Sequence, residues 1–292
     1  MIEFRKIGVI GGGNFGRGIA QTASSVGLNV IIMEKDASGI EISKGWLIQE
    51  MDIEINKWGM TESDKKAILS RIEYTLDWNK FKDIDIVIES VPELFEVKVK
   101  SLINIERVIS EKTVIATNCA TLSITELASK LSKPERLIGV HFHYPVVKRP
   151  LVEIVRGLKT TQETFEIARA LIKVLKKESV EVFEYPGYIT TRAILPFLNE
   201  AMHIVMEGVA SVENVDKAMK LAYDLKIGPL ELADQIGLEK VLFWMEHLFG
   251  ELGEAKYRAC PILRKMVRAG HLGVKTGIGF YRYKDGKKET IK

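Results

Sequence analysis

The feature that most constrains the fold is a cluster of glycines directly after a short apolar run near the start of the chain. The apolar run covers residues 6 to 10 (KIGVI), and the sequence GGGNFG follows at residues 11 to 16. Apolar residues then recur at helical spacing over residues 14 to 26, and a second apolar run, NVIIME, covers residues 29 to 34. This order predicts a strand, a tight turn, a helix and a second strand.

The glycines fit the G-x-G-x-x-G pattern of a dinucleotide-binding turn, and Glu34 follows the last of them by 18 residues. Glycines at these positions allow a tight turn and a close approach of the backbone to a pyrophosphate, which the helix amino end attracts. Glu34 would accept hydrogen bonds from the adenosine ribose and repel a 2′-phosphate, which favours NAD over NADP. The alternative is a glycine-rich turn without a ligand. We predict an NAD site made by Gly11, Gly13, Asn14, Phe15, Gly16 and Glu34.

Strands and helices continue to alternate after one helical interruption. Residues 38 to about 71 carry a helical pattern that breaks at Trp58 and Gly59, which predicts a helical hairpin. Further apolar runs lie at 84–89, 113–118, 137–142, 150–155 and 179–183, with helical segments between them. Thr160 and Glu163 have the spacing of a capping box at the start of one such helix. The alternation predicts a Rossmann-type, doubly wound, mostly parallel sheet with a helical hairpin insertion.

The pattern changes after residues 185 to 187 (YPG). Residues 188 to about 271 are rich in Ala, Leu and Met at helical spacing, and no segment there predicts a strand. We therefore expect a dinucleotide-binding domain over residues 1–184 and an all-α domain over residues 185–292.

Composition narrows the class of partner. The chain has 292 residues, 46% of them hydrophobic, and a formal net charge of only +3, so no basic face indicates nucleic acid or a membrane surface. No apolar run reaches the length of a spanning helix, and the start does not resemble a signal peptide. The two cysteines, Cys119 and Cys260, suit a reducing compartment. We expect a cytoplasmic protein that acts on a small molecule.

The chain resembles the 3-hydroxyacyl-CoA dehydrogenase family, including the 3-hydroxybutyryl-CoA dehydrogenases, over nearly its full length. The matching segments occur in the family's order, and they are IVIESVPELFEVK (86–98), ATNCATLSITELA (116–128), GVHFHYP with VEIV (139–155), PGYITTR (186–192), IGPLELADQIGL (227–238) and GVKTGIGFYRY (273–283). The resemblance implies an NAD-dependent dehydrogenase whose helical domain binds substrate and forms a homodimer.

The resemblance also implies a catalytic pair in the segment 139–155. His141 would take the proton from a secondary alcohol as hydride leaves the same carbon, and Glu153 would hold the imidazole in its correct tautomer. An imidazole with a pKa near neutral suits this task, and a carboxylate behind it stabilises the imidazolium. Without the resemblance, His141 would be interpreted as an ordinary core histidine. We interpret His143 as a wall or surface residue.

Further site residues follow only from the resemblance. It places Glu93, Lys98, Asn118 and Lys275 near the cofactor, and no metal is expected. The chain departs from the family at the substrate pocket, where Ala120 replaces a serine that bonds the substrate oxygen, and where Thr191 and Tyr144 replace asparagines. Thr121 is a candidate to replace the lost serine contact.

The predicted reaction is the interconversion of an L-3-hydroxyacyl-CoA and a 3-oxoacyl-CoA. The helical hairpin raises a question about CoA, because Glu50, Asp52 and Glu54 make it acidic, and carboxylates repel phosphates. One alternative is a dehydrogenase of a hydroxy acid without CoA. Another is a catalytically impaired homologue that binds NAD without useful turnover.

Overall fold

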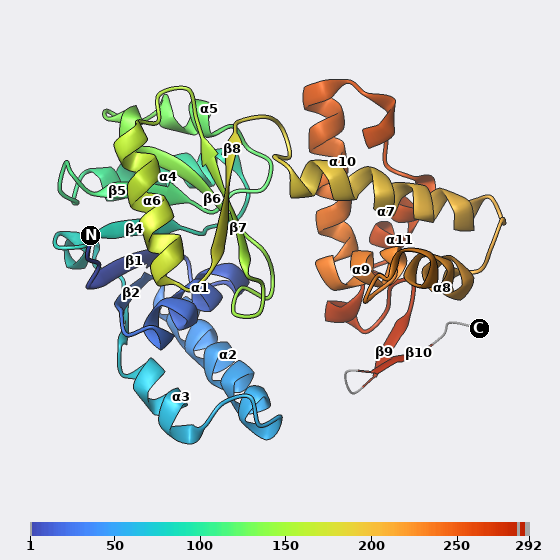
Figure 1. The fold of residues 1–292 in the computed structure, drawn as a ribbon, viewed down its shortest axis with the longest axis horizontal. Helices are drawn as coiled ribbons and strands as arrows, with labels where there is room; N and C mark the ends of the chain where they lie inside the picture. Colours follow the sequence, from blue (N-terminus) through green and yellow to red (C-terminus); the bar gives the residue numbers. More distant parts are fainter. Residues whose placement is uncertain (1, 285–286, 290–292) are drawn as a thin grey trace. The chain divides into compact units, whose positions relative to one another are not determined.

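The computed structural model describes residues 2–284 and 287–289 and divides into two compact units, Met1–Tyr188 and Ile189–Lys292 (Figure 1). The first unit is built on an eight-stranded sheet with the order β3-β2-β1-β4-β5-β6-β7-β8. Its strands are β1 (Lys6–Ile10), β2 (Asn29–Met33), β3 (Ile72–Thr75), β4 (Ile86–Glu89), β5 (Val114–Thr117), β6 (Leu137–Phe142), β7 (Leu151–Arg156) and β8 (Glu178–Phe183). The predicted Rossmann-type sheet is confirmed.

The direction of the strands determines where a ligand can bind. Neighbouring strands are parallel except β6 and β7, which are antiparallel. The strand order reverses between β1 and β4, so the connections that leave these two strands diverge to opposite sides. In open α/β sheets such a reversal at the carboxyl ends of the strands is the usual ligand crevice.

Helices cover both faces of this sheet. One core contains buried apolar residues of α1 (Asn14–Ser25) and α6 (Gln162–Val174), and the other contains those of α4 (Phe95–Glu106) and α5 (Ile124–Ala128). Figure 1 labels these four helices around the sheet. The short 3₁₀ helices of this unit are η1 (Trp78–Phe81) and η2 (Pro134–Arg136). Because apolar helices lie on both faces, the central strands are largely apolar, as the sequence indicates, and polar residues such as Glu89, Thr117 and His141 lie close to their carboxyl ends.

The predicted helical hairpin consists of α2 (Ala37–Asn56) and α3 (Glu62–Leu69). The hairpin has a small apolar core of its own, which consists of Leu47, Met51 and Ile68. The turn contains Trp58 with a φ of 58°, in the left-handed region, which explains the break in the helical pattern there.

Two local predictions need correction. Strand β3 follows the hairpin where no strand was expected, because its sequence IEYT mixes apolar and polar residues and lacks a continuous apolar run. The cap of α6 is Thr161, whose hydroxyl accepts from the Thr164 N–H, whereas the predicted cap Thr160 donates to the Leu137 carbonyl.

The second unit is helical, as predicted, around one apolar core. Its helices are α7 (Thr190–Met206), α8 (Val212–Tyr223), α9 (Pro229–Ile236), α10 (Leu238–Leu252) and α11 (Pro261–Arg268), with the 3₁₀ helices η3 (Ala255–Tyr257) and η4 (Val274–Thr276). The unit also contains an antiparallel pair of strands, β9 (Arg282–Lys284) and β10 (Lys287–Glu289), which the prediction of an all-α domain omitted. Among the helices of the described residues, none has both the length and the apolar composition for a bilayer crossing.

Candidate active site

The glycine turn between β1 and α1 leaves no room for side chains at Gly11 and Gly16. Gly11 has a φ of +93°, which favours glycine, and a Cβ on Gly16 would lie 1.8 Å from the Gly11 carbonyl oxygen. A Cβ on Gly13, in contrast, would meet no heavy atom of the described residues within 4 Å. The turn is therefore packed tightly on its inner side and open at Gly13.

The amino end of α1 is available to an anion. Gly13 is the N-cap in extended conformation, and no side chain of the described residues caps the helix. The first N–H groups of a helix carry a partial positive charge and attract phosphate. Asn14 opens the helix, and the ring of Phe15 contacts the ring of Tyr144 edge-on at a centroid distance of 6.2 Å.

Glu34 lies directly beside the glycine turn. It follows β2, and its Oε1 accepts a hydrogen bond from the Gly12 N–H at 2.7 Å. The carboxylate is half-buried, so it reaches the turn while remaining accessible to a ribose. A tight turn, an uncapped helix and an adjacent carboxylate together fit NAD.

The carboxyl ends of β4 and β5 are joined by a buried ion pair. Lys98 of α4 and Glu89 of β4 both have 0% exposed side chains, and the Lys98 Nζ lies 3.0 Å and 3.1 Å from the two Glu89 oxygens. Nζ also donates to the Asn118 carbonyl at 2.8 Å. Burial lowers the pKa of Lys98, but Glu89 and Glu93 outweigh it, so this pKa lies above its ordinary value. Lys98 thus holds the strand ends together beneath the crevice.

Glu93 organises the loop after β5. Its Oε1 accepts the N–H groups of Ala120 at 2.7 Å and Thr121 at 2.9 Å, and also the Thr121 hydroxyl. Burial raises the pKa of Glu93, but Lys98 and these N–H groups outweigh it, so the pKa is lowered. Burial and Glu93 raise the pKa of the neighbouring Cys119 thiol far above its usual range, so Cys119 is not a thiolate nucleophile.

His141 and Glu153 lie directly opposite each other on the antiparallel pair β6 and β7. The Nδ1 of His141 is 2.6 Å from Glu153 Oε2, both residues are buried, and the Glu153 side chain has 0% exposure. Asn118 holds the end of the same strand, because its Oδ1 accepts the Phe142 N–H at 3.1 Å. A buried carboxylate that fixes an imidazole at a strand end is an arrangement suited to general base catalysis.

His143 lies directly beside this pair, closer than its interpretation as a wall or surface residue implied. Its Nε2 is 3.7 Å from Glu153 Oε2, and its ring centroid is 4.5 Å from that of His141. Burial, followed by His141, lowers the pKa of His143 to about 4, so this imidazole is neutral near pH 7.

The sequence interpretation did not single out two residues of the site. Glu89 binds Lys98, and the only sequence signal for it is a carboxylate at the end of an apolar run. Tyr188 packs its ring edge-on against His141 at a centroid distance of 5.8 Å, and its hydroxyl donates to the Leu122 carbonyl. Tyr188 lies 47 positions after His141 in the sequence, so only the fold brings them together.

Two of the predicted site residues belong to the second unit. Thr191 lies in the first turn of α7, and Lys275 in η4 forms an ion pair with Glu239. Their roles remain predictions.

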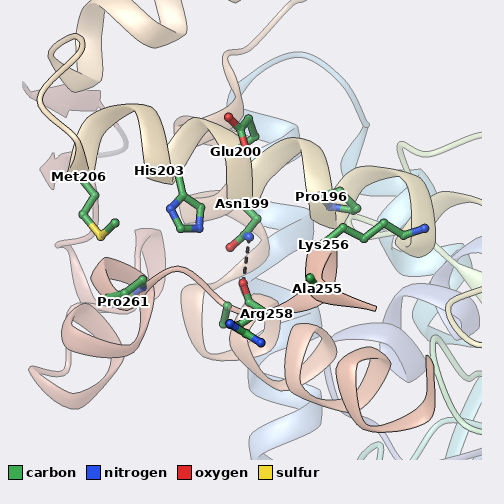
Figure 2. Close-up of a pocket in the computed structure, with 10 residues that line it drawn as sticks. Pro196, Asn199, Glu200, His203, Met206, Ala255, Lys256, Arg258 and Pro261 are labelled. Carbon is green, nitrogen blue, oxygen red and sulfur yellow. Dashed lines mark hydrogen bonds between the residues drawn. The ribbon is translucent and has the colours of Figure 1, made fainter. Parts of the chain in front are cut away.

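The second unit also has a cavity of about 470 Å³ between α7, η3 and the start of α11 (Figure 2). Asn199 lines it and donates to the Arg258 carbonyl at 3.1 Å, while its Oδ1 accepts the Cys260 N–H. This asparagine therefore ties α7 to the segment that follows η3.

Comparison with known families agrees with this geometry. Residues 6–185 match the model of the 3-hydroxyacyl-CoA dehydrogenase NAD binding domain, and residues 187–283 match that of the 3-hydroxyacyl-CoA dehydrogenase C-terminal domain. The chain belongs to the 3-hydroxyacyl-CoA dehydrogenase family. It is an NAD-dependent oxidoreductase, which confirms the family and cofactor expected from the sequence.

Individual relatives resemble the chain over nearly its whole length. A probable 3-hydroxybutyryl-CoA dehydrogenase of Bacillus subtilis is 40% identical over 97% of this chain and 99% of its own. The 3-hydroxybutyryl-CoA dehydrogenase of Clostridioides difficile is 40% identical over 95% of this chain and 99% of its own. The crystal structure of (S)-3-hydroxybutyryl-CoA dehydrogenase from Ralstonia eutropha has a TM-score of 0.89 at 40% identity and covers 97% of this chain and 100% of its own.

Proposed function

We propose that this dehydrogenase interconverts an L-3-hydroxyacyl-CoA and a 3-oxoacyl-CoA, with His141 as general base. The observation that carries the proposal is the buried 2.6 Å contact between His141 Nδ1 and Glu153 Oε2 at the carboxyl end of β6. Strand ends at this edge of a parallel sheet are where ligands bind.

Glu153 determines which nitrogen of His141 acts as the base. A carboxylate accepts hydrogen bonds, so Nδ1 carries the proton and Nε2 keeps its lone pair. In the oxidative direction Nε2 takes the hydroxyl proton of the substrate, and Glu153 stabilises the imidazolium that forms. In the reductive direction the imidazolium returns that proton to the oxygen. Tyr188 limits the rotation of the imidazole through its edge-on contact.

The residues that hold NAD lie at the same edge of the sheet. Bound NAD supplies the hydride acceptor for the alcohol carbon. The turn of Gly11, Gly13 and Gly16 and the start of α1, with Asn14 and Phe15, receive the pyrophosphate, and Glu34 receives the adenosine ribose. Glu93, Lys98 and Asn118 shape the nicotinamide end, and Lys275 is a further cofactor contact implied by the family.

The charge of the hairpin is compatible with CoA. Arg17 forms two hydrogen bonds with Glu50, Lys65 pairs with Asp52, and Lys148 pairs with Glu54 at 2.6 Å. The three carboxylates that would repel the phosphates of CoA are therefore each paired with a cation. The relatives named above act on 3-hydroxybutyryl-CoA by name, which supports a short acyl chain.

Substrate contacts follow the family where the residues allow it. Ala120 cannot bond the substrate oxygen, and we assign that contact to the neighbouring Thr121. Thr191 is a further substrate contact that the family resemblance implies. The Thr121 hydroxyl lies 3.2 Å from Glu93 Oε1, so a small rotation redirects it.

An NADH oxidation assay tests the substrate class. Acetoacetyl-CoA is compared with free acetoacetate and other keto acids, and rapid turnover of the CoA ester alone is expected. Turnover of a free acid without turnover of any CoA ester would support the hydroxy-acid alternative. NAD binding without turnover of any candidate substrate would support the alternative of a catalytically impaired homologue, which is considered because Ala120 replaces the family's serine.

Variants of the catalytic pair test the base assignment. His141→Ala is expected to abolish turnover with little change in NAD affinity, and Glu153→Gln to lower kcat by about 10²- to 10⁴-fold. His203→Ala, on α7 of the other unit, is the matched control and should keep the wild-type rate. Near-wild-type turnover in His141→Ala would refute the assignment.

The homodimer is also a proposal, supported by the family resemblance of the helical unit. Light scattering after gel filtration is expected to give twice the chain mass of 32.9 kDa. A monomer mass across the micromolar range would contradict it.

A further inference from the structure

Three side chains that bind transition metals meet at the candidate base. His141, His143 and Glu153 each offer one ligand atom, and these atoms all lie within 4.8 Å of one another. Glu153 Oε2 is the common neighbour, 2.6 Å from His141 Nδ1 and 3.7 Å from His143 Nε2. Two imidazole nitrogens and one carboxylate form the ligand set of many zinc sites, with a fourth position left for water.

His143 Nε2 is the second observation that indicates a ligand. This nitrogen is buried and has no hydrogen-bond partner among the described residues. A distance of 3.7 Å to Glu153 is too long for a hydrogen bond. Buried polar atoms are normally satisfied, because leaving one without a partner costs about 1–3 kcal/mol. A cation between His143 and Glu153 would satisfy this atom.

The present spacing is close to that of a tetrahedral ion. Ligand bonds of about 2.05 Å at tetrahedral angles separate two ligand atoms by roughly 3.3 Å. The contact between His141 and Glu153, now 2.6 Å, must therefore open by about 0.7 Å. The contact between His143 and Glu153, now 3.7 Å, must close by about 0.4 Å. The nitrogens of His141 and His143 lie within 4.8 Å of each other and must approach to the same roughly 3.3 Å. Side-chain rotations can supply changes of this size.

We propose that His141, His143 and Glu153 form an inhibitory binding site for Zn²⁺. The ion takes the place of the proton on His141 Nδ1, between this nitrogen and Glu153 Oε2. A neutral imidazole that binds metal through Nδ1 carries its proton on Nε2, where it can no longer accept the proton of the substrate. Inhibition rests on the proposed role of His141 as base, whereas metal binding does not.

The test measures metal binding and turnover separately. Zn²⁺ is titrated by calorimetry into enzyme freed of metal with EDTA, and Co²⁺ is added to the same enzyme to record its visible absorption. We expect one Zn²⁺ per chain, a Co²⁺ spectrum of a four- or five-coordinate ion, and loss of turnover with the same midpoint as binding. Mg²⁺ should have no effect, because it prefers oxygen ligands.

His143→Phe is the decisive variant, because it removes one ligand and leaves the pair of His141 and Glu153 in place. Zinc affinity should fall at least about 100-fold, since even an outer-shell partner of a metal site contributes about 10- to 100-fold. Inhibition of the variant is expressed relative to its own rate in EDTA. His143→Gln repeats the test if the phenylalanine variant does not fold. His203→Phe is the control for zinc bound elsewhere and should match the wild type.

The outcomes are distinguishable. Absence of Zn²⁺ binding to the wild type, or equal affinity in the wild type and the His143 variants, overturns the site. Binding at this site without inhibition overturns the inhibitory role. If the enzyme turns over no candidate substrate, the proposed function fails, and the Co²⁺ spectra of the wild type and the variants still decide whether the site exists.

Discussion

Replacing Lys98 with methionine tests whether the buried ion pair holds the strand ends that frame the site. Lys98 and Glu89 have 0% exposed side chains, and Nζ contacts both Glu89 oxygens and the Asn118 carbonyl. Methionine fills similar volume without charge, so Lys98→Met leaves the Glu89 carboxylate buried without a counter-ion. The Val91 N–H and the Thr117 hydroxyl still donate to it, but neither carries a charge.

Removing one partner of a buried pair costs about 3–5 kcal/mol of unfolding free energy. For a unit of this size each kcal/mol corresponds to a shift of about 2–4 °C in Tm, so Tm should fall by roughly 6–20 °C. The variant should also bind NAD more weakly, because Lys98 positions the carbonyl of Asn118. Differential scanning calorimetry at pH 7 measures the first effect, and quenching of protein fluorescence by NADH the second.

Two matched variants complete the test. Lys100→Met removes an exposed lysine from the same helix and should change Tm by no more than about 2 °C. Lys98→Met combined with Glu89→Gln removes both charges and should recover a large part of the lost stability. A Tm for Lys98→Met within 2 °C of the wild type, or a double variant no more stable than Lys98→Met alone, would refute the reasoning.

Three further predictions concern neighbouring residues. The pKa of His143 is lowered from 6.5 to about 4, so the unfolded chain binds a proton that the folded chain refuses, and stability is lost as pH falls from about 6.5 to 4. The free energy of unfolding of His143→Phe, minus that of the wild type, should therefore be about 2 kcal/mol larger at pH 5 than at pH 7. Urea titrations measure this difference, and the same value at both pH values would contradict the prediction. Glu93→Ala should cost about 2–4 kcal/mol by leaving the Ala120 and Thr121 N–H groups unpaired, whereas Glu96→Ala on the exposed side of α4 should be nearly neutral in the same thermal assay. Ala120→Ser should raise kcat/KM on acetoacetyl-CoA about fivefold by adding one hydrogen bond to the substrate oxygen, and a fall would mean that the pocket has been rebuilt around alanine.

Features that depend on neighbouring residues in the chain could be predicted from the sequence. The glycine turn, α1 and Glu34 lie within a stretch of 24 residues, and the tight packing of Gly16 on Gly11 is a local requirement. The continuous apolar runs predicted most strands of the sheet, because burial on both faces demands them. Strand β3 was missed because an edge strand does not carry that pattern.

The candidate base and its partner depended on more than the local pattern. His141 and Glu153 are 12 residues apart, and they face each other only because β7 runs antiparallel to β6. If β7 ran parallel to β6, the pairing of the two strands would be different, and His141 would not be matched with Glu153 by this register. The family resemblance therefore selected this pair, and the residues alone favoured an ordinary core histidine.

The sequence by itself determined the sheet-and-helix order, the change to a helical second unit, and a turn shaped for a dinucleotide, because backbone sterics and apolar periodicity act over a few residues. Only the tertiary structure decided which charges meet. It buried Lys98 against Glu89, turned Glu93 onto the loop of Ala120, and brought His143 beside Glu153. These contacts join different strands and helices, and their energies depend on burial, which a residue acquires only when the whole sheet has assembled.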